Sequence, residues 1–141
     1  MVRIIFSYGQ DERPRAEVII YNDIKEIKLA PIVDSGADTT VIPQGIGEEL
    51  GLIPPTEKEI RELKEERLSC ADGNCIDYVV RKIKMKIDCF DFELDVCWLF
   101  NNKNSHFLLG RDIFEKFDIL FKQNPAKKVI FESDKNIFNI N

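Results

Sequence analysis

Apolar and polar residues alternate along most of the chain, and this period of two predicts a mainly β protein. Runs rich in β-branched and aromatic residues at Val2–Phe6 and Glu17–Tyr21 favour strands. The alternation is strictest in "KIKMKID" (82–88) and "FDFELDVCW" (90–98). We expect these two segments to pair as antiparallel neighbours, with the lysines of one opposite the acidic residues of the other.

Shorter segments predict the remaining regular elements. "GIGEELGL" (45–52) predicts a brief helix that ends at Gly51, and "RDIFEKF" (111–117) predicts one short C-terminal helix with Asp112 as candidate N-cap. Further short strands are expected in "EIKLAPIVD" (26–34), "TTVIP" (39–43), "HFLLG" (106–110), "DILFK" (118–122) and "KKVIF" (127–131), the last two completing the sheet.

The segment "TEKEIRELKEER" (56–67) fits two structures. Thr56 and Glu59 have the spacing of a helix capping box, whereas the alternative is a highly charged strand that leads into the next hairpin. That hairpin is predicted in "RLSCADGNCIDYVV" (67–80), where the Asp72-Gly73 step lies between two strand-like arms.

Composition limits the class of protein. The 141 residues, 44% of them apolar and 32% charged, predict a single globular domain spanning residues 1–141. A net charge of −5 argues against a nucleic-acid partner. Because no apolar run approaches the roughly 20 residues that cross a bilayer, we expect no membrane partner and a cytoplasmic location.

The four cysteines, at positions 70, 75, 89 and 97, do not have the spacing of a zinc site. We expect buried thiols, because free cysteine behaves as a small apolar residue. Cys70 and Cys75 flank the predicted hairpin tip, where a disulfide would form under oxidising conditions.

The candidate chemistry lies in "IVDSGADTTVIP" (32–43), a polar cluster directly behind an apolar strand. Ser35 lacks the G-x-S-x-G pattern of a serine nucleophile, and His106 is the only histidine in the chain. "GIGEELG" resembles a dinucleotide-binding loop but has neither its spacing nor its βαβ context. A carboxylate mechanism remains, in which Asp34 ends the strand and Ser35 and Gly36 form the turn.

Peptide hydrolysis by carboxylates requires two of them, one to activate water and one to donate a proton. The chain contains no second Asp-[Ser/Thr]-Gly. If the pair exists, Asp34 must therefore meet its own copy on the axis of a two-fold symmetric homodimer.

The sequence resembles the retropepsin-like aspartic proteases. "VDSGADTTVI" is similar to their first signature, "FLLGRDIF" is similar to their second, and the hairpin predicted between them corresponds to the flap; the order agrees from about Lys28 to Phe121. The resemblance implies the closed β-barrel-like acid protease fold, with a flap hairpin and one short C-terminal helix. It further implies a homodimeric aspartic endopeptidase that acts on peptides or proteins without a cofactor or metal.

The resemblance also implies roles for individual residues. Asp34 would be the catalytic carboxylate, with Ser35 bracing the dimer and Gly36 holding the substrate backbone. Asp38 would lie near the substrate and form an ion pair with Arg111. The other implied positions are substrate contacts at Ala37, Val41, Leu108 and the flap tip (Ala71, Asp72 and Gly73), with structural support from Thr40 and Gly110; strand parity leaves Val41 and Leu108 open by one residue.

Two alternatives to the protease remain. A catalytically silent dimer would use the same cleft to bind an extended peptide or protein partner. A divalent cation would lie between the carboxylates of Asp34 and Asp38. The flap tip "ADGN" departs from the Gly-rich flaps of retroviral members, and the termini before Lys28 and after Phe131 match no motif, which leaves the mode of dimerisation open.

Overall fold

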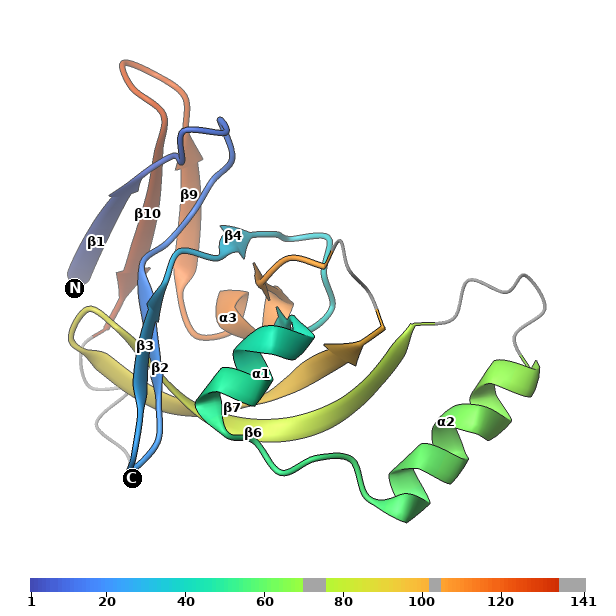
Figure 1. Cartoon of the computed structure of the whole chain (residues 1–141). Coiled ribbons are helices and arrows are strands. Elements are labelled where there is room, and N and C mark those ends of the chain that lie inside the picture. The colour runs from blue at the N-terminus through green and yellow to red at the C-terminus, as the bar shows by residue number, and fades with distance from the viewer. Residues whose placement is uncertain (70–75, 102–104, 135–141) are drawn as a thin grey trace.

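The computed structural model describes residues 1–69, 76–101 and 105–134. The fold is mainly β, as predicted, and is built from a curled seven-stranded sheet, a three-stranded sheet and a few helices (Figure 1). The strands are β1 (Val2–Ser7), β2 (Val18–Tyr21), β3 (Glu26–Leu29), β4 (Ile32–Val33), β5 (Val41–Ile42), β6 (Asp77–Ile87), β7 (Phe90–Phe100), β8 (Leu108–Leu109), β9 (Asp118–Lys122) and β10 (Lys128–Ser133). The helices are α1 (Gln44–Leu50), α2 (Glu57–Ser69) and α3 (Arg111–Phe114).

The long hairpin of β6 and β7 forms the middle of the larger sheet, whose strand order is β3-β2-β6-β7-β5-β8-β4. Its register confirms the predicted charge pairing, with Lys82 opposite Asp95, Lys84 opposite Glu93 and Lys86 opposite Asp91. The intervening residues of both strands face the core, and Met85, Ile87 and Val96 are completely buried there. The strict alternation thus places one face of the hairpin in water and the other in the core.

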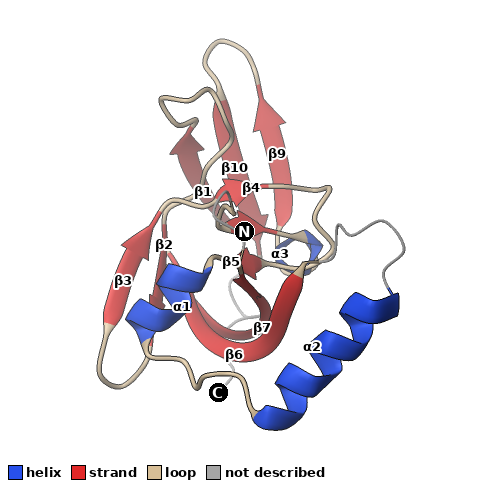
Figure 2. Cartoon of the chain, turned by 45° about the vertical axis from the view of Figure 1, so that its right-hand side comes forward, coloured by secondary structure: helices blue, strands red, loops and turns tan. Residues whose placement is uncertain are grey.

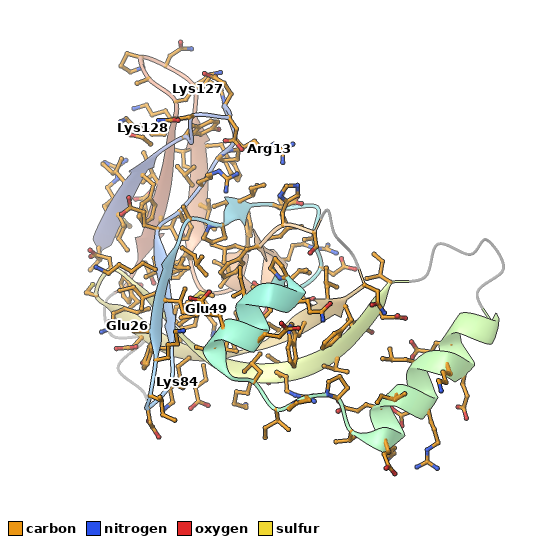
Figure 3. The ribbon with its side chains drawn as sticks, viewed as in Figure 1. Arg13, Glu26, Glu49, Lys84, Lys127 and Lys128 are labelled. Atoms are coloured by element: carbon orange, nitrogen blue, oxygen red, sulfur yellow. The ribbon has the colours of Figure 1, made fainter. Side chains whose placement is uncertain are left out.

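The prediction that β9 and β10 complete the larger sheet is wrong. They pair with each other and with β1 in a separate sheet of order β1-β10-β9. Its inner face shares the hydrophobic core with the larger sheet. Within the smaller sheet, the rings of Phe6 on β1 and Phe131 on β10 make an edge-to-face contact with centroids 5.6 Å apart. Lys127 and Lys128 lie at its far end (Figure 3). There Lys127 donates a hydrogen bond to Glu12, and Lys128 donates one to Ser7. The pairing of these distant strands buries their apolar residues in the shared core, which local patterning does not encode.

The ambiguous segment at 56–67 is helical and belongs to α2. The capping box is reciprocal: the Glu59 amide donates to Thr56 Oγ1 at 3.1 Å, and the Thr56 amide donates to Glu59 Oε1 at 2.9 Å. Residues 67–69 continue the helix, so the strand predicted for the first arm of the hairpin is wrong. The cap and the helix-favouring Glu, Lys, Arg and Leu residues outweigh the local hairpin signal. The hairpin tip at 70–75 lies outside the described residues.

Helix α2 is joined to the sheet by a two-pronged ion pair. Arg81 of β6 donates to both carboxylate oxygens of Glu59, each at 2.8 Å, and its Nε donates to the Ile53 carbonyl at 3.0 Å. The hydrogen bond from Arg81 is the main reason that the pKa of Glu59 is lowered to about 2. The pair therefore joins α2 to β6 at every pH at which Glu59 is ionised.

Two cysteines correct the expectation of buried thiols. Cys89 is exposed and Cys97 is partly exposed. Cys89 lies in the tight turn between β6 and β7, where Asp88 has a positive φ of 53°. Cys70 and Cys75 lie outside the described residues, so the disulfide stays a prediction.

The Glu59–Arg81 pair predicts a specific loss of stability in acid. Because the pKa of Glu59 is depressed to about 2 in the folded protein, its stabilising effect is present above the ordinary pKa of 4.5 and is lost as the pH falls towards 2. We expect the difference in free energy of unfolding between the wild type and Glu59→Gln to shrink between pH 6 and pH 3, as measured by urea denaturation. Glu65→Gln, at an exposed position of the same helix, is the control. A difference that does not change with pH would contradict this account of the pair.

Candidate active site

The polar cluster at 34–40 lies where three short strands meet. β8 is inserted between β4 and β5, although β4 and β5 follow each other in the chain. β4 and β8 run parallel, so both strands end at the same edge of the sheet. Asp34, which follows β4, and Gly110, which follows β8, are therefore brought together from distant parts of the sequence.

Backbone contacts hold the loop closely against Gly110. The Asp34 amide donates to the Leu109 carbonyl, and the Arg111 amide donates to the Ala37 carbonyl, each at 2.9 Å. A Cβ atom on Gly110 would lie 2.4 Å from the backbone carbon and oxygen of Thr39. The second motif thus requires glycine because the 34–40 loop passes directly over it.

The carboxylate of Asp34 is half-buried at the start of an exposed turn. Its Oδ1 accepts a hydrogen bond from the Gly36 amide at 2.8 Å, and its backbone carbonyl accepts one from the Ala37 amide at 3.2 Å. Ser35 and Gly36 are exposed. The turn therefore orients the Asp34 carboxylate while leaving it accessible to water or a second chain.

A buried hydrogen-bond network lies behind the loop. Thr40 is completely buried; its hydroxyl donates to Asp112 Oδ1 at 2.7 Å and accepts from the Gly110 amide at 3.2 Å. The Thr40 amide donates to Asp112 Oδ2 at 2.9 Å. The prediction that Asp112 is the N-cap of α3 is therefore wrong. Gly110 occupies that position, and the carboxylate of Asp112 binds the loop instead.

Asp112 is the residue that sequence reasoning missed in this site. Its position within the first turn of a short helix made a capping role plausible, since carboxylates favour that turn. The signal that would have identified it is the buried hydroxyl of Thr40, because a buried hydroxyl requires a hydrogen-bond partner.

Asp38 and Arg111 form the ion pair that the resemblance implies. Their side chains are 80% and 60% exposed, so the pair contributes little to overall stability. Its effect is local, because it joins the active-site loop to α3.

The structure also shows which face of the sheet the side chains of Val41 and Leu108 occupy. These two residues pair in register and are half-buried, whereas their neighbours Ile42 and Leu109 are completely buried in the core. The partly exposed face continues onto Cys97 of β7, whose Sγ lies 3.2 Å from Thr39 Oγ1. Val41 and Leu108 therefore face away from the core, beside the loop.

The remaining predicted residues are not placed. Ala71, Asp72 and Gly73 lie outside the described residues. Within the described part of the chain, no group of three or more His, Cys, Asp or Glu residues is arranged to hold a metal ion. In the same part, no helix has the length and apolar character to cross a membrane.

Gly110 provides a test of the loop crossing. We expect Gly110→Ala to lower the free energy of unfolding by about 1–3 kcal/mol, because the new methyl group must displace backbone. Gly45→Ala is the matched control: a Cβ there meets open space in α1, and the change should raise stability by about 0.5–1 kcal/mol. Urea denaturation of both variants measures the contrast, and equal stability of the two variants would contradict the crossing.

Comparison with known proteins agrees with this geometry. A family model described as retroviral aspartyl protease matches residues 10–122. A crystal structure of a retropepsin-like aspartic protease from Rickettsia conorii superposes with a TM-score of 0.61 at 17% identity, covering 92% of this chain and 90% of that chain. EIAV protease in complex with the inhibitor HBY-793 gives a TM-score of 0.51 at 17% identity, covering 78% and 92%.

Comparison with curated protein sequences gives no match. At 17% identity the two structural likenesses show the fold alone. The family model, in contrast, covers most of the chain and includes both the 34–40 loop and the Gly110 crossing. The protein therefore belongs to the retroviral aspartyl protease family.

Proposed function

We propose that the protein is a homodimeric aspartic endopeptidase whose active site forms where the Asp34 carboxylates of two copies meet. The observation that carries the proposal is the Asp34 turn, which presents an oriented, accessible carboxylate at the edge of the sheet. The chain has one Asp-Ser-Gly sequence, so each copy supplies half of the catalytic pair. A two-fold axis beside the turn would make the interface isologous.

The chemistry of the pair follows from electrostatics. Two neighbouring carboxyl groups share one proton, because ionising both places like charges side by side. The ionised group takes a proton from a bound water, whose oxygen attacks the scissile carbonyl carbon, and the protonated group donates to the carbonyl oxygen. The carboxyl that took the water proton then donates it to the leaving nitrogen, and the C–N bond breaks. As the tetrahedral intermediate collapses to the carboxylic acid product, one of its hydroxyl groups returns a proton to the other carboxylate, so the pair again holds one proton.

The surrounding residues hold the loop and the substrate. Ser35 braces the paired turns, and the Gly36 backbone together with Ala37 and Asp38 contacts the substrate main chain. Arg111 holds Asp38 in place through the ion pair described above. Further positions in the proposal are Val41 and Leu108 as apolar pocket walls, Thr40 and Gly110 as supports of the loop, and Ala71, Asp72 and Gly73 at the tip of a closing flap.

Asp34→Asn tests the chemistry directly. We expect this variant to cleave an unfolded protein substrate at least about 100-fold more slowly than the wild type, because an amide neither accepts nor donates the required proton. Cleavage is measured from pH 3 to pH 7, with and without a statine-containing peptide, and Asp118→Asn is the control at an exposed position of β9. Retained cleavage in Asp34→Asn would overturn the assignment. If neither protein cleaves but both bind an extended peptide, the chain acts as a binding module instead.

A mixing experiment tests the shared site. When equal amounts of wild type and Asp34→Asn exchange subunits, about one quarter of the dimers are wild type in both copies. We expect the activity of the mixture to be about one quarter of that of wild type alone at the same total protein concentration, and not one half. The reason is that a mixed dimer has only one Asp34 carboxylate. Activity of one half would show that a single subunit suffices.

A further inference from the structure

The smaller sheet has an outer face that no helix covers. In Figure 2, α1 and α2 both lie beside the larger sheet, away from β1, β10 and β9. The inner face of the smaller sheet packs on α3, where the ring centroids of Phe114 and Phe121 are 6.3 Å apart. Because α3 is also bonded to the 34–40 loop, the outer face points away from the candidate active site.

A row of apolar side chains crosses this outer face. The register places Ile5 opposite Ile130, and Ile130 opposite Leu120. Ile5 is 57% exposed and Leu120 is 46% exposed, whereas Ile130 between them is 3% exposed and is not part of the core that the two sheets share. The solvated face of an antiparallel sheet is ordinarily polar. A continuous apolar row on such a face therefore indicates an interaction surface.

Like charges lie next to each other on both sides of the apolar row. On one side Lys128 of β10 is opposite Lys122 of β9, and on the other side Glu132 is opposite Asp118. Like charges directly opposite each other destabilise a sheet. The β6–β7 hairpin has the contrary arrangement, in which lysines are opposite acidic residues. The separate basic and acidic rows of the smaller sheet are therefore unfavourable in a single copy of the chain.

Partners within the chain neutralise only some of these charges. Arg3 lies 3.7 Å from Glu132, and Lys128 donates a hydrogen bond to a neutral hydroxyl. The side chains of Asp118 and Lys122 form no ion pair or hydrogen bond with any residue that the structure describes. One acidic and one basic side chain are thus left for a partner, at the two ends of β9.

A second copy of the chain has the complementary surface. When two smaller sheets pack face to face about a two-fold axis along the apolar row, the apolar rows coincide and each charged row lies over the row of opposite sign. Glu132 then lies over the partner's Lys128, and Asp118 lies over the partner's Lys122. An axis along the strands would instead place like charges over each other. Charge complementarity therefore selects the first arrangement.

We propose that the outer face of the smaller sheet, with Ile5, Ile130 and Leu120 at its centre, binds the same face of a second copy of this chain. This contact is separate from the one proposed at Asp34 and does not require protease activity. Each copy contributes about three strand widths by five residues, or about 14 by 17 Å, so the contact buries roughly 500 Å² in total. That area is small for a specific interface, so the self-association is weak and depends on protein concentration.

Sedimentation velocity over about a hundredfold range of protein concentration tests the proposal. We expect the wild type to associate as concentration rises, and Ile5→Lys, which places a charge in the apolar row, to weaken association at least about tenfold. Ile24→Lys is the matched control, because Ile24 is 96% exposed between β2 and β3 and lies off this face. Circular dichroism checks that each variant is folded. A wild type that does not associate, or equal association of Ile5→Lys and wild type, would overturn the proposal.

Charge reversal tests the orientation of the two copies. Lys128→Glu places a carboxylate over the partner's Glu132 and should weaken association, whereas the further change Glu132→Lys should restore it. Added salt should weaken the wild-type contact. Association through the outer edge of β9 would survive these changes, since they lie on β1 and β10, and that result would overturn the proposal.

The size of the dissociated particle separates this inference from the proposed function. If copies also pair at Asp34, the wild type passes from dimer to tetramer, and Ile5→Lys stays a dimer. If they do not, the wild type passes from monomer to dimer, and Ile5→Lys stays a monomer. Either result supports the contact at the outer face, and the second contradicts the dimer proposed at Asp34.

Discussion

The passage of the 34–40 loop over Gly110 is the constraint on which the candidate site depends. The loop approaches so closely that a single methyl group would collide with the backbone of Thr39. Thr40 and Asp112 close the same crossing with part-buried hydrogen bonds, and the Gly110 amide donates a buried one to the Thr40 hydroxyl. Because buried polar groups are costly when unpaired, each member of this network holds the others in place. The Asp34 turn thus rests on a rigid support formed by two distant segments.

This support explains how a small chain can present a reactive carboxylate without destabilising itself. The turn orients one oxygen of Asp34 through the Gly36 amide and leaves the group partly exposed. In the proposed dimer, the second carboxylate comes from the partner copy, so the unfavourable approach of two acids occurs only on association. Folding of the chain and assembly of the site are then separate steps.

Helix α2 flanks the first half of β6 at one edge of the larger sheet. Residues 57–69 form a helix and add no strand to the sheet, and the Glu59–Arg81 pair joins this helix to β6. Tyr78 and Val80 are exposed on the outer face of β6. Glu59, Glu62 and Glu66 of this helix line a cavity of about 240 Å³ beside β6. One local choice of secondary structure therefore sets both the shape and the charge of that surface.

Much of the protein follows from the sequence alone. The alternation in β6 and β7 specifies their faces and register, because a shift of one residue would expose the core side chains. The two motifs identify Asp34, Asp38, Gly110 and Arg111 as candidate site residues, since their spacing is a property of the chain.

Tertiary structure decided the rest. The pairing of β1 with β10 and the bond between Thr40 and Asp112 both depend on contacts between distant segments. Local propensity favours several outcomes at such positions, and only the energy of packing and of buried hydrogen bonds selects among them.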